Sequence, residues 1–166
     1  MSVTNLEELF EHELRDTLDA ERQILKALPK MIKAAESEEL KAALTEHKSV
    51  TEEQVGRLET IFKSLDKAAR GKHCKGMEGL LAEGSDMIEE EETSPTLDAA
   101  MIGAAQKVEH YEIAAYGTLV EYAKLLGRDD AVELLSATLA EEKEADEKLS
   151  SVASELNLTA REQATG

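Results

Sequence analysis

The sequence is short of the residues that interrupt or crosslink a chain. Its 166 residues include two prolines, nine glycines, no tryptophan and one cysteine, Cys74. A single cysteine excludes an intrachain disulfide, and the first residues lack the basic and apolar regions of a secretion signal, so we expect a cytoplasmic protein. The sequence has no run of about 18 apolar residues, which predicts that no segment spans a membrane.

Positive charge is also scarce. The chain has 36 acidic residues against 19 lysines and arginines, and its formal net charge is −17. A nucleic-acid-binding surface needs cations to displace the counterions of the phosphates, so we expect no nucleic-acid partner. The excess of acid is compatible with cation binding, although most acidic residues of a helical protein simply form a solvated face.

What the sequence does contain is helical periodicity, with abundant Ala, Leu, Glu and Lys and apolar residues every three or four positions. We predict long helices at residues 4–35, 38–69, 95–126 and 129–157, a short helix at 76–91, and a single domain over 1–166. T-N-L-E at residues 4–7 has the form of a capping box, and Gly127 is placed to end a helix. The connection over 67–93 is too long for a turn between neighbouring helices, so its short helix would carry the chain back along the bundle.

Three of the long helices have a glutamate where the periodicity requires an apolar residue. These glutamates are Glu21, Glu112 and Glu142, and Glu109 lies one turn before Glu112, so that both carboxylates can lean toward one point. A carboxylate in an apolar seam is unfavourable unless it is paired, protonated or bound to a metal. Any one of them could instead reach solvent at the edge of its seam, but three such residues near helix centres are hard to explain in that way.

Sequence separation predicts that these acids lie at one height. Counted from the first turn, near residue 37, Glu21 and Glu53 are both 16 residues away, and counted from the second, near residue 127, Glu112 and Glu142 are both 15 residues away. At about 1.5 Å of rise per residue, each lies roughly 23 Å from its turn, near the middle of the bundle. The two hairpins therefore bring their acids to one layer.

Facing carboxylates and one long crossover are typical of ferritin-like metal bundles. We therefore predict an all-α, ferritin-like four-helix bundle with a long crossover that contains a short fifth helix. Oxygen ligands suit Fe, Mn, Mg or Ca, and we expect one or two divalent ions, Fe or Mn above all. The candidate ligands are Glu21, Glu109, Glu112 and Glu142, with His47 and Glu53 as weaker candidates. Bound iron would support oxidation of Fe(II) by oxygen or peroxide, with Glu109 or Glu112 as the bridge.

Several segments resemble one family of bacterial proteins. The segment A-A-Q-K-V-E-H-Y-E-I-A-A-Y-G-T-L, which begins at Ala104, is specific, and L-D-A-E-R-Q around Glu21, M-E-G-L-L at Met77 and L-x-E-E-K-x-A-D-x-K-L support it. From roughly Asn5 to Leu156 the chain resembles the YciE/YciF family. The resemblance implies a ferritin-like dimeric bundle that is associated with stress responses and has a di-metal site, but no established biochemical activity.

One position departs from the pattern of this family. The family usually has H-L-x-E-T where this chain reads H-K-S-V-T, so Val50 stands in place of a carboxylate, and E-x-x-H occurs nowhere in the sequence. Either Glu53, one turn further on, substitutes and two ions bind, or one ion bound through Glu109, Glu112 and Glu142 predominates. We favour the second alternative.

Two functions are compatible with these features. The first is metal binding in the carboxylate layer, and the alternative is a non-enzymatic, dimeric stress or adaptor protein with a degenerate metal site. The sequence identifies no catalytic residue. We expect a homodimer, because the short helix offers more apolar side chains than one edge of a bundle needs, unless it simply covers its own bundle. These side chains are Met77, Leu80, Leu81, Met87 and Ile88.

Overall fold

The computed structural model describes residues 3–163, so the ends of the predicted 1–166 domain lie outside the described residues. These residues form five α helices and no strand, which confirms the predicted all-α fold. The helices are α1 (Leu6–Ala34), α2 (Glu38–Ser64), α3 (Lys75–Glu90), α4 (Pro95–Leu125) and α5 (Asp129–Gln163). None of the helices within residues 3–163 is both long and apolar enough to cross a membrane.

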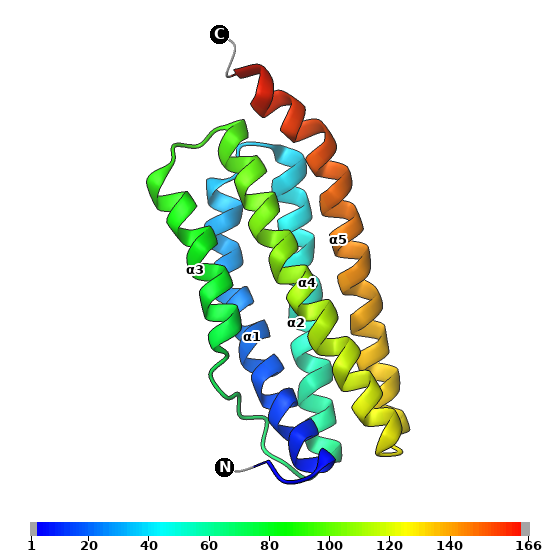
Figure 1. Cartoon of the computed structure of the whole chain (residues 1–166). Coiled ribbons are helices and arrows are strands. Elements are labelled where there is room, and N and C mark those ends of the chain that lie inside the picture. The colour runs from blue at the N-terminus through cyan, green and yellow to red at the C-terminus, as the bar shows by residue number, and fades with distance from the viewer. Residues whose placement is uncertain (1–2, 164–166) are drawn as a thin grey trace.

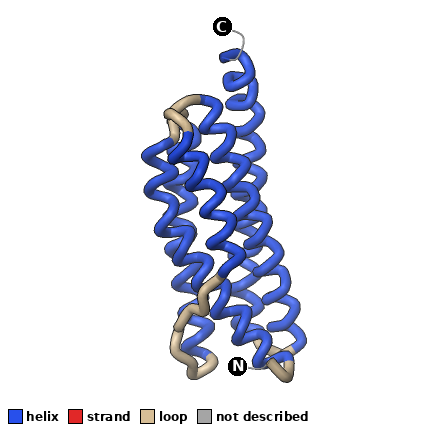
Figure 2. Tube along the Cα trace, turned by 60° about the vertical axis from the view of Figure 1, so that its left-hand side comes forward, coloured by secondary structure: helices blue, strands red, loops and turns tan. Residues whose placement is uncertain are grey.

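The four long helices lie side by side, and α3 covers one edge of the bundle (Figure 1). Helices α1 and α2 form one antiparallel hairpin, and α4 and α5 form the other. The connection after α2, together with α3, returns the chain to the end where α2 began, so α4 runs in the same direction as α2 (Figure 1). Loops occur mainly at the two ends of the bundle (Figure 2). This is the return connection that the long segment between α2 and α4 predicts.

The ends of the helices differ by a few residues from the prediction. Helix α1 begins two residues later, at Leu6, because Asn5 caps it by accepting the Glu8 N–H at 2.9 Å. The Glu8 carboxylate in turn accepts the Thr4 N–H and hydroxyl, both at 2.8 Å. Helix α5 continues to Gln163, past the predicted end near residue 157, and projects beyond the other helices (Figure 1).

Helix α2 stops at Ser64, before the predicted end near residue 69, because the chain turns at Asp66. Asp66 has a φ of 54°, its N–H bonds to the Lys63 carbonyl, and the Lys67 N–H bonds to the Phe62 carbonyl. This pair of bonds is the Schellman motif. The same pair closes α4 around Gly127, whose φ is 65°, as the sequence predicts for this glycine.

Helix α3 packs most of its apolar face against its own bundle. Met77 is fully buried, and Leu80, Leu81 and Ile88 pack half-buried against the core, while Met87 remains 38% exposed. Helix α3 therefore leaves little uncovered apolar surface for a second subunit to bury. The homodimer itself stays a prediction.

The start of α3 is fixed to the bundle by Tyr111. The Tyr111 hydroxyl donates to Asp16 and lies 2.9 Å from the Cys74 Sγ, and Cys74 itself caps α3 and is buried. The ring also lies so close to Gly76 that a Cβ there would approach its Cε2 to 2.9 Å. Cys74 thus has a packing role at a helix end.

Two apolar clusters fill the bundle, one on each side of its middle. The upper cluster lies toward the α1–α2 turn and includes Ile24, Leu28, Leu44, Met101, Val108 and Leu149. The lower cluster lies toward the α4–α5 turn and includes Phe10, Leu14, Phe62, Tyr116, Leu119 and Leu135. The predicted metal ligands lie between these clusters.

Replacing Asp66 with glycine should stabilise the protein. A non-glycine residue in the left-handed region is strained by about 1 kcal/mol, and glycine avoids this strain but has more freedom in the unfolded chain. We expect the free energy of unfolding in urea to rise by about 0.5 kcal/mol. As a matched control, Gly127→Ala should lower it by about 1 kcal/mol, because alanine would acquire the strain that Asp66 has now. A loss of stability in Asp66→Gly would contradict this account of the turn.

Candidate metal centre

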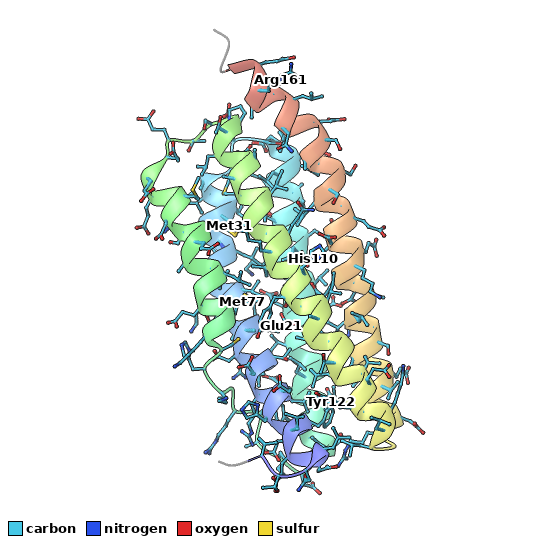
Figure 3. The ribbon with its side chains drawn as sticks, viewed as in Figure 1. Glu21, Met31, Met77, His110, Tyr122 and Arg161 are labelled. Atoms are coloured by element: carbon cyan, nitrogen blue, oxygen red, sulfur yellow. The ribbon has the colours of Figure 1, made fainter. Side chains whose placement is uncertain are left out.

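Four glutamates meet at the middle of the bundle and form what we call the acid layer. Glu21 comes from α1, Glu109 and Glu112 from α4, and Glu142 from α5, and none is more than 2% exposed. Glu21 lies near mid-height among the long helices (Figure 3). The prediction that Glu21, Glu112 and Glu142 share one height therefore agrees with the structure.

Potential ligand atoms in this layer fall into two groups. Carboxylate oxygens of Glu21, Glu112 and Glu142 lie within 4.8 Å of one another. A second set, made of one ring nitrogen of His47 and oxygens of Glu109 and Glu142, meets the same limit. Glu142 belongs to both groups, so its carboxylate is the one that would be shared if each group held an ion.

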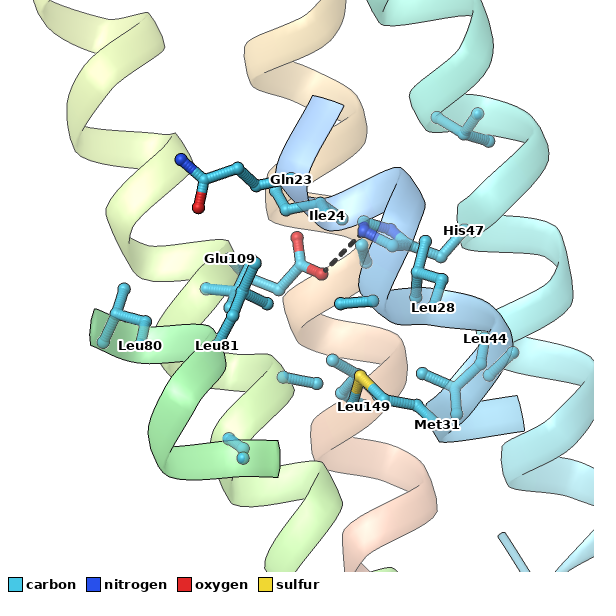
Figure 4. Close-up of a pocket in the computed structure, with 18 of the residues that line it drawn as sticks. Gln23, Ile24, Leu28, Met31, Leu44, His47, Leu80, Leu81, Glu109 and Leu149 are labelled. Carbon is cyan, nitrogen blue, oxygen red and sulfur yellow. Dashed lines mark ion pairs between the residues drawn. The ribbon is translucent and has the colours of Figure 1, made fainter. Parts of the chain in front are cut away.

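Few protein hydrogen bonds reach these carboxylates. Tyr116 donates its hydroxyl to Glu21, and Gln54 donates its side-chain N–H to Glu142. The His47 Nε2 lies 3.5 Å from a Glu109 oxygen (Figure 4). Within residues 3–163, five buried carboxylate oxygens lack a hydrogen-bond partner: Glu21 Oε2, Glu109 Oε2, both oxygens of Glu112 and Glu142 Oε2.

Such orphaned oxygens are unusual, because buried polar atoms in proteins are almost always hydrogen-bonded. They are buried, where an unpaired carboxylate carries a penalty of several kcal/mol. Protons or cations must therefore complete the layer.

Burial shifts the pKa values of this layer strongly. It raises the pKa of Glu21 to about 8, with the neighbouring Glu142 charge as the second cause. Burial and Glu142 likewise raise the pKa of Glu109 to about 11, and burial beside Glu21 raises the pKa of Glu112 well above its usual value. The pKa of His47 is lowered by burial, so its imidazole is neutral at pH 7 and able to bind a metal.

Helix α2 contributes His47 and Gln54 to the layer but not Glu53. The Glu53 side chain is 71% exposed and lies 3.9 Å from Arg57, so its prediction as a ligand from sequence separation is wrong for this structure. Counting residues gives the height along a helix but not the direction around it. Adjacent residues differ by about 100° around the axis, and Gln54, the next residue, is the one that faces inward.

Val50, one turn before Gln54 on α2, is half-buried and lines a cavity beside the layer. Its apolar side chain leaves the α2 side of the layer with one imidazole and one amide. His110, by contrast, points outward, as expected: its side chain is 67% exposed and lies 3.2 Å from Asp146.

Two residues of the layer were not predicted as part of the site. Tyr116 is four residues from Glu112, a spacing that places it on the same helix face. Gln54, which follows Glu53, was not among the candidate ligands. A polar side chain in an apolar seam is the signal that both residues share with the glutamates.

The donor set fits Fe(II) or Mn(II). Four carboxylates and one neutral imidazole combine hard oxygen ligands with a nitrogen ligand, which suits these ions better than Ca or Mg, whose sites are built from oxygen alone. One carboxylate oxygen from each of Glu21, Glu112 and Glu142 lies within 4.8 Å of the others, close enough for one ion to bind all three.

A four-helix bundle with a long return connection and inward carboxylates from facing helices is a ferritin-like bundle. The chain belongs to the family described as "Domain of unknown function (DUF892)", whose pattern matches residues 5–162. It is 44% identical over 155 residues to Protein YciF of Escherichia coli (strain K12), which covers 92% of this chain and 93% of YciF. The predicted relationship to the YciE/YciF family is therefore confirmed.

Solved structures show the same relationship. The crystal structure of the E. coli stress protein YciF matches with a TM-score of 0.89 and 41% identity over 93% of this chain and 98% of that one. YcfI from Rhodopseudomonas palustris, whose name assigns it a structural role, matches with a TM-score of 0.87 and 44% identity over 90% of this chain and 95% of that one. A protein from Xanthomonas campestris pv. campestris, 20% identical over 98% of this chain and all of that one, shares the fold with a TM-score of 0.80.

Without metal, the protein should lose stability as the pH rises from about 5 to 8. The folded-state pKa of Glu21, about 8, is above its ordinary value of 4.5. A raised carboxyl pKa gives stability that is fully present below the unfolded value and is lost as the pH rises through the folded value. Thermal melts of chelator-treated protein between pH 5 and 8.5 would measure this decline.

The variant Glu112→Gln isolates the contribution of the layer to this decline. It removes one buried acid and its repulsion of Glu21, so the melting temperature should fall less steeply with pH than in the original protein. Glu53→Gln is the matched control, because it removes an exposed acid from the same part of the bundle. Equal slopes in all three proteins would refute the assignment.

Proposed function

We propose that the protein binds divalent metal, Fe or Mn, in the acid layer. The observation that supports this most directly is the group of five buried carboxylate oxygens that lack a hydrogen-bond partner among the described residues. Buried like charges at this separation repel one another, and a divalent ion removes that repulsion where protons otherwise would. The stress association of YciF is consistent with a metal centre, and we extend it to this chain as part of the proposal.

The two ligand groups give room for two ions of unequal affinity. Glu21, Glu112 and Glu142 would hold the first with three carboxylates, and His47, Glu109 and Glu142 would hold the second with fewer charges. The sequence favoured one site made of Glu109, Glu112 and Glu142. In this proposal these three residues belong to two ion sites instead of one. The second ion should bind more weakly than the first, because Val50 places an apolar side chain where the family pattern has a carboxylate.

The protein's own residues would prepare the layer for this role. Tyr116 donates to one oxygen of Glu21 and Gln54 donates to one oxygen of Glu142, which leaves the second oxygen of each carboxylate free to bind an ion. If the bound metal is Fe(II), the chemistry available in the layer would be oxidation of that Fe(II) by oxygen or peroxide.

A non-enzymatic role as a dimeric stress or adaptor protein is the second candidate. One observation favours it: the structural role in the name of YcfI, a relative of similar sequence and fold. In that case the layer would keep shared protons in place of metal, and the homodimer would be the functional unit.

Metal should raise both the stability and the metal content of the protein. An ion that binds only the folded state stabilises it by about 2.7 kcal/mol at 100 times its Kd, so Mn(II) should raise the melting temperature by several degrees. Elemental analysis after gel filtration should find between one and two Mn per chain. Glu112→Gln should lose most of this metal, whereas Glu53→Gln should keep it. An unchanged melt at saturating Mn(II), with no retained metal, would favour the non-enzymatic role.

Restoring a carboxylate at position 50 should strengthen the second ion. In Val50→Glu the new side chain lies one turn from His47 on the same face of α2, so it adds a charge to the weaker group. Mn content should rise toward two per chain, and the weaker Kd should fall at least tenfold in a titration. Val50→Gln is the matched control, with the same length and no charge. An original protein that already binds two ions with equal affinity would overturn the proposed asymmetry.

A further inference from the structure

A cavity of about 510 Å³ lies directly beside the acid layer, in the upper half of the bundle. Its walls come from all five helices and are mainly apolar (Figure 4). Among the residues that line it are Ile24, Leu28, Leu44, Leu81, Val108 and Leu149. This volume is within the range of pockets that hold small organic molecules.

Small side chains create this cavity. Ala27, Ala43, Ala105 and Ala145 line it from four different helices, where longer apolar residues would meet across the bundle. The lower half of the bundle differs, because Phe10, Phe62 and Tyr116 fill it. The two halves are thus built differently on either side of one acid layer.

The cavity reaches the surface at two places. Exposed residues of α1 and α3 line one end, and exposed residues of α2 and α5 line the other. An ion pair spans each gap: Lys30 with Glu89 at 2.6 Å, and Lys148 with Glu46. Exposed ion pairs contribute little stability, so these side chains can move aside for a molecule that enters.

The inner end of the cavity is formed by His47, Glu109 and Glu142, which are also the second ligand group of the acid layer. A molecule in the cavity would therefore lie next to the candidate metal centre rather than at a remote surface. Val50 adds an apolar contact at the same end.

The chemistry of the walls defines the ligand. Buried carboxylates at the inner end disfavour an anion, as does the net charge of −17. The lysines that line the cavity, Lys26, Lys30 and Lys148, are all exposed and lie at its ends. Most of the remaining surface is aliphatic, so it favours contact with carbon and hydrogen atoms.

We propose that this cavity binds an uncharged, apolar organic molecule against the acid layer. Such molecules are then the substrate class of the metal centre, a statement that rests on the proposed function. Binding in the cavity itself does not require the metal, because the apolar walls supply it.

Binding is tested with the uncharged fluorescent probe N-phenyl-1-naphthylamine and metal-free protein. One probe should bind per chain with increased emission. Ala145→Leu fills the α5 wall and should weaken binding at least tenfold, whereas Ala137→Leu, on the exposed face of the same helix, should leave it unchanged. Ala27→Leu fills the opposite wall and replaces Ala145→Leu if that variant does not fold. Equal probe binding by the filled and original proteins overturns the proposal.

The position beside the metal is tested with a trifluoromethyl-substituted naphthalene followed by fluorine NMR. Mn(II) is paramagnetic and should broaden the resonance of the bound probe, whereas Mg(II) should not. Probe binding without retained Mn(II) would leave the cavity site standing and overturn the proposed metal function. Retained Mn(II) without probe binding would leave the metal function standing and overturn the cavity site. Binding of both without broadening would overturn the assignment of the probe to the inner end.

Discussion

The structure depends on the burial of four carboxylates between two apolar clusters. Each cluster alone resembles an ordinary helical core, but Glu21, Glu109, Glu112 and Glu142 join them with no more than 2% of any residue exposed. Ions in such a place carry a penalty of several kcal/mol each unless their charge is neutralised. Tyr116 and Gln54 supply neutral hydrogen bonds only, so neutralisation must come from protons or bound cations.

The path of the chain follows from this layer. The return through α3 brings α4 to the end where α2 begins, so the turns of the two hairpins lie at opposite ends of the bundle (Figure 1). The acids, 15 or 16 residues from either turn, therefore meet at mid-height. Tyr111 ties the beginning of α3 to α1 through Asp16. The crossover therefore has a structural role, because its direction determines which helices face one another across the acid layer.

The sequence predicted the parts of this arrangement that depend on distance along the chain. Apolar periodicity located the five helices, and an acid in an apolar seam identified each carboxylate of the layer. The direction in which a side chain points from its helix was harder to predict. Glu53 was therefore proposed as a ligand because it has the correct height, whereas its neighbour Gln54 is the residue that faces inward. The end of α2 was missed because Asp66 adopts a conformation more typical of glycine. The cavity could not be predicted, because it depends on how small residues from separate helices meet.

Position 50 connects the two proposals. In the family pattern a carboxylate stands there, and it would add charge at the point where the cavity meets the acid layer. Val50 instead extends the apolar wall and leaves His47 as the nearest α2 ligand. Under the two proposals, Val50 would both weaken the second metal position and make the adjoining cavity more apolar. An uncharged molecule that enters there meets no hydrated α2 carboxylate that has to be stripped of water, so valine would favour its binding more than a carboxylate at this position would.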